Sequence, residues 1–343
     1  MITGHSVSSR ASDRAILRPL AERYRELAAL DVQRERLGRY RGTVALDDVR
    51  PVVLIDEVPW GEIRDDALTN RCQDPELRGI EGRIRRALYQ WDHFQVDMVI
   101  PPTFTVRKRA VSTGIGIEVQ DHRIQGDTGA YIMAHEYVDQ LATEEDLEKL
   151  TLPQITYDEE RTRAEAAAAE EIFDGLMPVE IRGTSFIYNI WDSISTYRGV
   201  DNLLMDLAVR PELMHHTARR FMEIGKSMFE QYLELGLLDT NPILLHCTPA
   251  WTEELPSSDF AGDLRPSDVW GRCSAQIFSA VSPAMHDEFD LQYNQELFGD
   301  CGLLYYGCCE PLDGKIDLLR KRFPNLRKVS ITPWANPDRA ADA

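Results

Sequence analysis

The sequence has few cysteines for its length, no long hydrophobic run and a shortage of basic side chains. Six cysteines are spread over 343 residues, which is typical of a reducing compartment and argues against a disulfide framework. No stretch approaches the roughly 18 uncharged apolar residues of a membrane span, and the N-terminal segment lacks the apolar centre of a secretory leader. We therefore expect a cytoplasmic protein with no membrane partner.

Charge excludes another class of partner. Lys and Arg number 38 against 57 Asp and Glu, which makes the formal charge -19. Nucleic acids and anionic membranes are bound by clustered Lys and Arg, and the nearest approach to a cluster is the short run 107–109. The chain also lacks GxGxxG, P-loop and GxSxG motifs, so nothing indicates a dinucleotide enzyme, a nucleotide enzyme or a serine hydrolase.

What the sequence does contain, from residue 177 onward, is an alternation of strand and helix patterns. The predicted strands cover 178–183, 242–247, 303–306 and 326–332, and the predicted helices cover 201–208, 210–235, 282–298 and 313–323. This alternation indicates a parallel sheet and, at this chain length, an α/β fold of the (β/α)8 TIM-type barrel class. A helix that begins at Asn336 is cut short at Ala343, so we expect the final βα unit to be missing.

The first 95 residues are predicted to form a helical extension that precedes a barrel domain at 96–343. An amphipathic helix is expected over 11–37, and Asp74-Pro75 is a typical start for a second one. Val96–Ile100, closed by two prolines, predicts the first buried strand.

Two further segments carry predictions. Residues 115–119 and 122–125 have the pattern of a hairpin inserted into the barrel domain. The segment 251–282 has few helix formers and is long for a compact domain. Such loops are commonly lids, so we expect it to cover the site.

Chemistry in barrels is carried at the C-terminal ends of the strands. Residues 306–310, Tyr-Gly-Cys-Cys-Glu, end one predicted strand, and His246 lies at the end of another. Thiolate, imidazole and carboxylate together form a zinc ligand set, and three protein ligands with an open position mark a catalytic zinc. The candidate metal ligands are therefore Cys308, His246 and Cys309, with ordinary buried packing as the alternative for each.

The remaining candidates follow from the same strand ends. Three residues are candidate catalytic groups, with turn capping as the alternative for the last: Glu310, Tyr306 and Asp97. Four aromatic residues and one amide are candidates for substrate binding, with core packing as the alternative for the aromatics: Tyr188, Trp191, Trp251, Trp334 and Gln276.

Three segments resemble one family. They are Gly183-Thr184-Ser185, residues 199–213 and residues 278–285, and from about Val96 onward the chain is similar to the uroporphyrinogen decarboxylase superfamily. The resemblance implies a (β/α)8 barrel. The superfamily includes the haem-pathway decarboxylase and zinc-dependent methyltransferases that serve corrinoid proteins.

The resemblance is closer to the methyltransferase branch. The decarboxylases carry an arginine-rich loop that binds substrate carboxylates, whereas residues 52–60 contain no arginine. The methyltransferases carry His-x-Cys-Gly on a strand, and the matching place here has Cys308 at the cysteine and Tyr306 at the histidine. The resemblance implies that His246, Cys309 or Glu310 completes the ligand set, and that the family's later cysteine would lie beyond the end of this sequence.

The expected function is zinc-dependent transfer of a methyl group between a small methylated substrate and the corrinoid, a cobalamin, of a partner protein. Two alternatives stay open. One is a metal-independent decarboxylase acting on a small carboxylic acid, with Glu310 or Asp97 as general acid. The other is a non-catalytic barrel that binds a corrinoid protein or a ligand.

Overall fold

The computed structural model describes residues 7–94, 96–124 and 134–343. The first six residues and Gln125, the end of the predicted hairpin, lie outside the described residues. The chain divides into two compact units, each assembled from three separated stretches. Unit 1 comprises Met1–Arg109, Tyr157–Thr184 and Pro242–Glu253, and unit 2 comprises Ala110–Thr156, Ser185–Asn241 and Glu254–Ala343. The predicted domain boundary after residue 95 stays a prediction.

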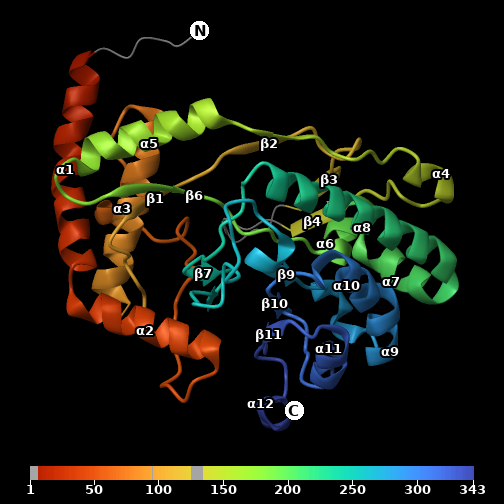
Figure 1. Ribbon diagram of the computed structural model, residues 1–343. Helices are drawn as coiled ribbons and strands as arrows, with labels where there is room; N and C mark the ends of the chain where they lie inside the picture. The colour runs from red at the N-terminus through yellow and green to blue at the C-terminus, as the bar shows by residue number, and fades with distance from the viewer. Residues whose placement is uncertain (1–6, 95, 125–133) are drawn as a thin grey trace. The chain divides into compact units, whose positions relative to one another are not determined.

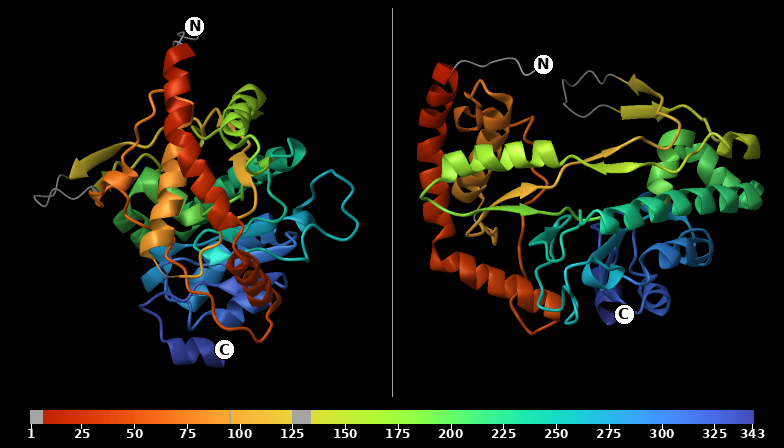
Figure 2. Two further views of the ribbon diagram at one scale, coloured as in Figure 1. Left: turned by 90° about the vertical axis from the view of Figure 1, so that its left-hand side faces the viewer. Right: turned by 45° about the horizontal axis from the view of Figure 1, so that its top comes forward.

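Unit 1 contains a group of helices and two pairs of strands. Its helices are α1 (Val7–Ala28), α2 (Asp31–Ala45), α3 (Pro75–His93), α5 (Glu159–Phe173) and the 3-10 turn η1 (Asp66–Leu68). Its strands are β1 (Phe104–Arg107), β6 (Val179–Arg182), β7 (Leu244–Leu245) and β8 (Thr248–Pro249). Strands β1 and β6 run side by side in parallel (Figure 2). Helices α1, α3 and α5 lie against one another (Figure 1). Their shared core includes Phe104 and Phe173, whose rings stack with centroids 4.4 Å apart.

Two predictions for unit 1 need correction. The helix expected over 11–37 is two helices, because Leu30 takes an extended conformation between α1 and α2. The strand expected at 96–100 does not form, because side chains of α2 make hydrogen bonds with its backbone in place of a neighbouring strand. Gln33 accepts from the Ile100 N–H, and Tyr40 donates to the Asp97 carbonyl. The predicted start of α3 is confirmed, since Asp74 accepts from two N–H groups of the first turn.

Unit 2 carries most of the strands and helices. Its strands are β2 (Ala110–Ser112), β3 (Asp121–Ile124), β4 (Ala134–Tyr137), β5 (Ile155–Tyr157, ending at the boundary), β9 (Trp270–Cys273), β10 (Leu303–Tyr306) and β11 (Leu326–Val329). Its helices are α4 (Glu144–Leu147), α6 (Ile190–Arg198), α7 (Val200–Val209), α8 (Pro211–Glu234), α9 (Pro283–His286), α10 (Gln292–Phe298), α11 (Ile316–Arg322) and α12 (Pro337–Asp342). Short 3-10 turns are η2 (Pro266–Asp268) and η3 (Gln276–Ala280), and η4 (Asp287–Leu291) is a π-helical stretch.

A three-stranded parallel sheet, β11-β10-β9, organises the second half of unit 2. The chain forms β9, crosses by α9, η4 and α10 to β10, and crosses again by α11 to β11, which makes a βαβαβ arrangement. All four residues of β10 are buried, so the central strand predicted at 303–306 is confirmed. The described residues form small sheets and no closed barrel.

Two other predictions for unit 2 also need correction. Strand β9 lies inside the segment 251–282 that was expected to be a lid, and its four residues are buried in the sheet. The strand expected at 115–119 is irregular because Gly116 has a φ of 93°, outside the extended range. Strand β3 pairs instead with β4.

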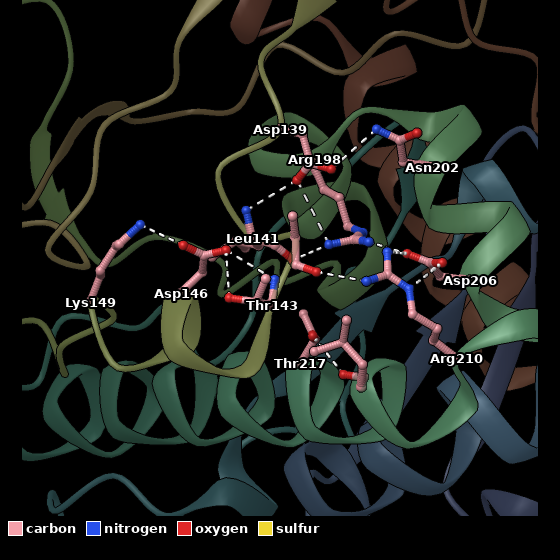
Figure 3. Close-up of polar contacts among 12 residues, drawn as sticks. Asp139, Leu141, Thr143, Asp146, Lys149, Arg198, Asn202, Asp206, Arg210 and Thr217 are labelled. Carbon is pink, nitrogen blue, oxygen red and sulfur yellow. Dashed lines mark hydrogen bonds and ion pairs between the residues drawn. The ribbon is translucent and has the colours of Figure 1, made fainter.

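A buried arginine fixes the C-terminal end of α6. Figure 3 shows Arg198, fully buried, between the Asp206 carboxylate and the Leu141 carbonyl, to both of which it donates. Burial alone would raise the pKa of Asp206, but hydrogen bonds from Arg210 and Arg198 lower it. Helix α6 is thereby held to α7 and to the segment before α4. In the described ranges, none of the helices has both the length and the apolar character that a bilayer crossing needs.

Candidate functional site

A cavity of about 420 Å³ lies in unit 2 among α6, α8 and the residues before α6. Its volume is within the range of small-molecule sites. Its apolar and aromatic lining includes Ile187, Tyr188, Phe221, Ile224 and Met228, and its polar lining includes Asn189, Asp192, Ser193 and Thr196. None of the described lining residues is Lys or Arg. The cavity therefore suits an uncharged, largely apolar ligand.

Tyr188 forms a rigid part of this lining. Its ring packs directly on α8 at Gly225, where an added Cβ would lie 2.6 Å from the ring carbon Cδ1. Its hydroxyl donates to the Phe221 carbonyl at 2.8 Å, and burial raises the pKa of the phenol. Tyr188 is thus a neutral aromatic surface, and Gly225 is required for its position.

Asp192 is the one carboxyl group among the described residues that line the cavity. It lies in the first turn of α6, next to Trp191, whose indole N–H donates to the Phe289 carbonyl at 2.8 Å and which is fully buried. Because Trp191 is fixed in the core, the following residue is directed to the cavity side of the helix.

The pKa of Asp192 is raised from 3.8 to about 6. Burial is the main cause, and the nearby carboxylates of Glu310 and Asp290 add to it. Hydrogen bonds from the Ile277 N–H and the Gln276 amide oppose the rise, but at 3.4 and 3.3 Å they are long and therefore weak. A carboxyl group with this pKa exists in both protonation states near neutral pH, as general acid–base catalysis requires.

Glu310 joins the loops that follow β9 and β10. It is fully buried, and its two carboxylate oxygens accept from the N–H groups of Ala275 at 3.1 Å and Cys308 at 3.0 Å. Ser274 and Gln276, in the same loop after β9, donate to Asp192 at 3.3 Å. The hydrogen-bond donors to Asp192 therefore come from the segment after the carboxyl end of β9, and Glu310 ties that segment to the one after β10. In α/β sheets, ligands bind at the carboxyl ends of parallel strands.

A chain of buried hydrogen bonds lies behind these loops. Lys315 contacts Nδ1 of His286 at 2.8 Å, His286 Nε2 contacts the Tyr306 hydroxyl at 2.6 Å, and that hydroxyl donates to Asp290 at 2.5 Å. Because an ammonium group only donates, Nδ1 of His286 accepts, and Nε2 then carries the proton toward Tyr306. All four side chains are buried. Each hydrogen bond in the series is therefore donated in the same direction, from Lys315 toward Asp290.

The π-helical stretch η4 supplies one end of this chain. It begins directly after His286 and contains Asp290, and it places His286 Nε2 3.6 Å from the Asp290 carboxylate. Short π-helical turns within α-helices occur frequently at functional sites. Burial raises the pKa of Tyr306 well above its ordinary value, and the negative charge of Asp290 raises it further. Tyr306 therefore stays a neutral donor.

Four of the predicted site residues lie in this part of unit 2. Tyr188 lines the cavity, Gln276 contacts Asp192, and Glu310 and Tyr306 belong to the buried polar groups behind it. Trp191 is a core residue that fixes α6. Trp334 is 79% exposed, so it does not enclose a pocket in the described part of unit 2.

The cysteines follow β10. The sulfur atoms of Cys308 and Cys309 lie 3.6 Å apart, and burial, together with the hydrogen bond between the two thiols, raises the pKa of the Cys308 thiol to about 12. Among the described residues, no three His, Cys, Asp or Glu side chains gather to hold a metal ion. Tyr306, which the resemblance would place at a histidine ligand position, already bonds to His286 and Asp290. These donors do not fit a three-ligand zinc site.

Three predicted residues belong to unit 1. Asp97 accepts from Arg39 at 2.6 Å and Arg50 at 2.7 Å, an ion-paired position typical of a structural carboxylate. The strand expected at 242–247 is a short antiparallel hairpin of β7 and β8, so His246 lies in its turn with a φ of 54°. Its Nδ1 lies 3.4 Å from a Glu57 oxygen. Trp251 follows β8.

Sequence reasoning missed Asp192, His286, Asp290 and Lys315. The spacing of His286 and Asp290, four apart in a predicted helix, places both on one face and was the available signal. Asp192 follows Trp191 directly, but no pattern distinguishes it from any other acidic residue in a first helical turn. Comparisons with family models, with curated proteins and with solved structures find no match to the chain, so the family resemblance stays a prediction.

Proposed function

We propose that the chain is an enzyme that acts on a small, uncharged and largely apolar substrate in the unit 2 cavity, with Asp192 as its general acid. One observation carries the proposal: a carboxyl group whose pKa is about 6 reaches a cavity that has a large apolar and aromatic surface and neither Lys nor Arg in its described lining. Burial and neighbouring carboxylates keep part of Asp192 protonated at neutral pH. Positioned acids of this kind contribute roughly 100- to 10,000-fold to a rate.

Methyl transfer is the reaction that best fits this cavity among those implied by the family resemblance. In a methyl ether substrate the bond between oxygen and the methyl carbon breaks, the oxygen keeps the electron pair, and Asp192 gives it a proton. The corrinoid of a partner protein would supply the nucleophile that accepts the methyl group. Tyr188 and its apolar neighbours exclude water and orient the ether oxygen toward the carboxyl group.

The alternatives fit less well. A carboxylic acid substrate needs a cation to bind it, and the described lining of the cavity has neither Lys nor Arg. A zinc-dependent step has no three-ligand donor set among the described residues, so the proposal involves no metal step. The (β/α)8 barrel remains part of the proposal, supported by the βαβαβ order of β9, β10 and β11.

The test uses chemically reduced cobalamin as methyl acceptor and a series of methoxybenzenes as donors, with formation of methylcobalamin followed by its visible absorbance. Asp192→Asn should lower the rate by roughly 100-fold or more. Asp201→Asn is the matched control, because Asp201 occupies the first turn of α7 but does not line the cavity. The wild-type rate should fall as pH rises through about 6, where Asp192 loses its proton.

Two outcomes contradict the proposal. One is that no methoxybenzene yields methylcobalamin above the rate without protein. The other is that both Asn variants keep the wild-type rate and pH profile. Zinc analysis of the purified protein, prepared with reduced thiols, separately tests the expectation from the family resemblance.

A further inference from the structure

A second cavity, of about 510 Å³, lies in unit 1 between α3, α5 and the end of β1. Three arginines line it, Arg83 from α3, Arg161 from α5 and Arg109 after β1, and Ile80 and Val106 give it an apolar part. At Gly79, an added Cβ would meet no atom within 4 Å. The cavity therefore has open space above α3, next to three guanidinium groups.

The arginines are held in place by their neighbours. Arg83 donates to the Thr105 carbonyl at 2.6 Å, and its guanidinium lies 4.3 Å from the centre of the Phe104 ring. Arg109 makes a two-pronged contact with Glu165, with bonds of 2.9 and 2.8 Å. Because these side chains are already ordered, little conformational entropy would be lost when they bind a ligand.

Arg161 is the least firmly held. Its Nε lies 3.4 Å from the Glu165 oxygen that Arg109 already contacts. One carboxylate thus serves two guanidinium groups. Only one other carboxylate, Glu76, is among the described lining residues, so the three arginines leave the cavity with excess positive charge. In a chain of charge -19 such a place attracts anions from solution.

We infer that this cavity binds a small organic anion, with its carboxylate or phosphate group between Arg83 and Arg161 and its apolar part on Ile80 and Val106. Guanidinium groups match both oxyanions in geometry. The incoming anion competes with Glu165 for Arg161. The contact between Glu165 and Arg161 is the one to be displaced, because it is longer than the contact between Glu165 and Arg109. The inference is independent of the reaction proposed for unit 2, because it rests on unit 1 residues alone.

Calorimetric titration of the whole protein with phenyl phosphate, benzoate, inorganic phosphate and benzyl alcohol tests the inference. The two aromatic anions should bind and the uncharged alcohol should not, and comparison of the two anions decides between phosphate and carboxylate. Arg83→Ala should weaken binding about tenfold or more, the effect of losing a hydrogen bond to a charged group. Arg163→Ala should leave it unchanged, because Arg163 belongs to α5 and pairs with Glu159, and neither residue lines the cavity.

Glu165→Gln gives a test that does not depend on loss of function. It removes the competing negative charge, so anion binding should become several-fold tighter, while the amide still accepts a hydrogen bond from Arg109. Tighter binding in this variant and weaker binding in Arg83→Ala support the inference. Failure of every anion to bind, equal weakening in Arg83→Ala and Arg163→Ala, or no gain in Glu165→Gln would overturn it.

Discussion

Replacement of Asp192 by Asn should stabilise the folded protein while it removes the proposed activity. Raising the pKa of this carboxyl group from 3.8 to about 6 corresponds to about 3 kcal/mol of unfavourable free energy when the group is ionised in the folded state. Solvent access to the cavity reduces the effect, so we expect a gain of about 2 kcal/mol. Asn has nearly the same shape and no charge to bury.

The sign of the pH dependence follows from the two protonation equilibria. Below about pH 3.8 the carboxyl group is protonated in both the folded and the unfolded state, so the variant and the wild type should be equally stable. Between pH 3.8 and about 6 the unfolded state loses its proton first. The folded wild type then loses stability as pH rises. The gain of Asp192→Asn should therefore be small at pH 4 and complete at pH 8.

Urea unfolding of both proteins across this pH range measures the difference, with Asp201→Asn as a control that should show no such gain. A gain of about 2 kcal/mol also raises Tm by roughly 4 to 8 °C for a unit of this size. The reasoning is refuted if Asp192→Asn is less stable than the wild type at pH 8, or if its gain is the same at pH 4 and pH 8. In either case burial would not determine the pKa of this group.

Four further substitutions test the packing. Gly225→Ala forces a Cβ to within 2.6 Å of the Tyr188 ring and should cost about 1–3 kcal/mol of unfolding free energy. Gly38→Ala, with no atom within 4 Å of the added Cβ, should instead raise the unfolding free energy by about 0.5–1 kcal/mol. If the two Ala variants had the same stability, the close contact between Gly225 and Tyr188 would be contradicted. Arg198→Met removes a fully buried cation and should cost about 3 kcal/mol by urea unfolding; a loss below about 1 kcal/mol would show that α6 is held by other contacts. Tyr306→Phe deletes the hydroxyl between His286 and Asp290 and should cost about 1–3 kcal/mol, with an unchanged circular dichroism spectrum; full wild-type stability would mean that the hydrogen-bonded chain contributes nothing.

Local signals in the sequence were enough for several elements. Asp74 and Pro75 mark the start of α3, because an N-cap acceptor and a proline act within one helical turn. The uncharged run at 303–306 identified β10, because a central strand buries both faces. Tyr306 and Glu310 were singled out because they end that strand, and both belong to the buried polar groups behind Asp192.

Only the tertiary structure decided the rest. Strand β9 contains a glycine and an arginine, and it became a strand because β10 pairs with it. The residues at 96–100 have a strand's composition, yet side chains of α2 took the hydrogen bonds that a neighbouring strand would have supplied. The raised pKa of Asp192 depends on burial and on carboxylates about a hundred residues away. Local sequence determines propensity and capping, whereas strand partners, burial and electrostatic surroundings depend on residues distant along the chain.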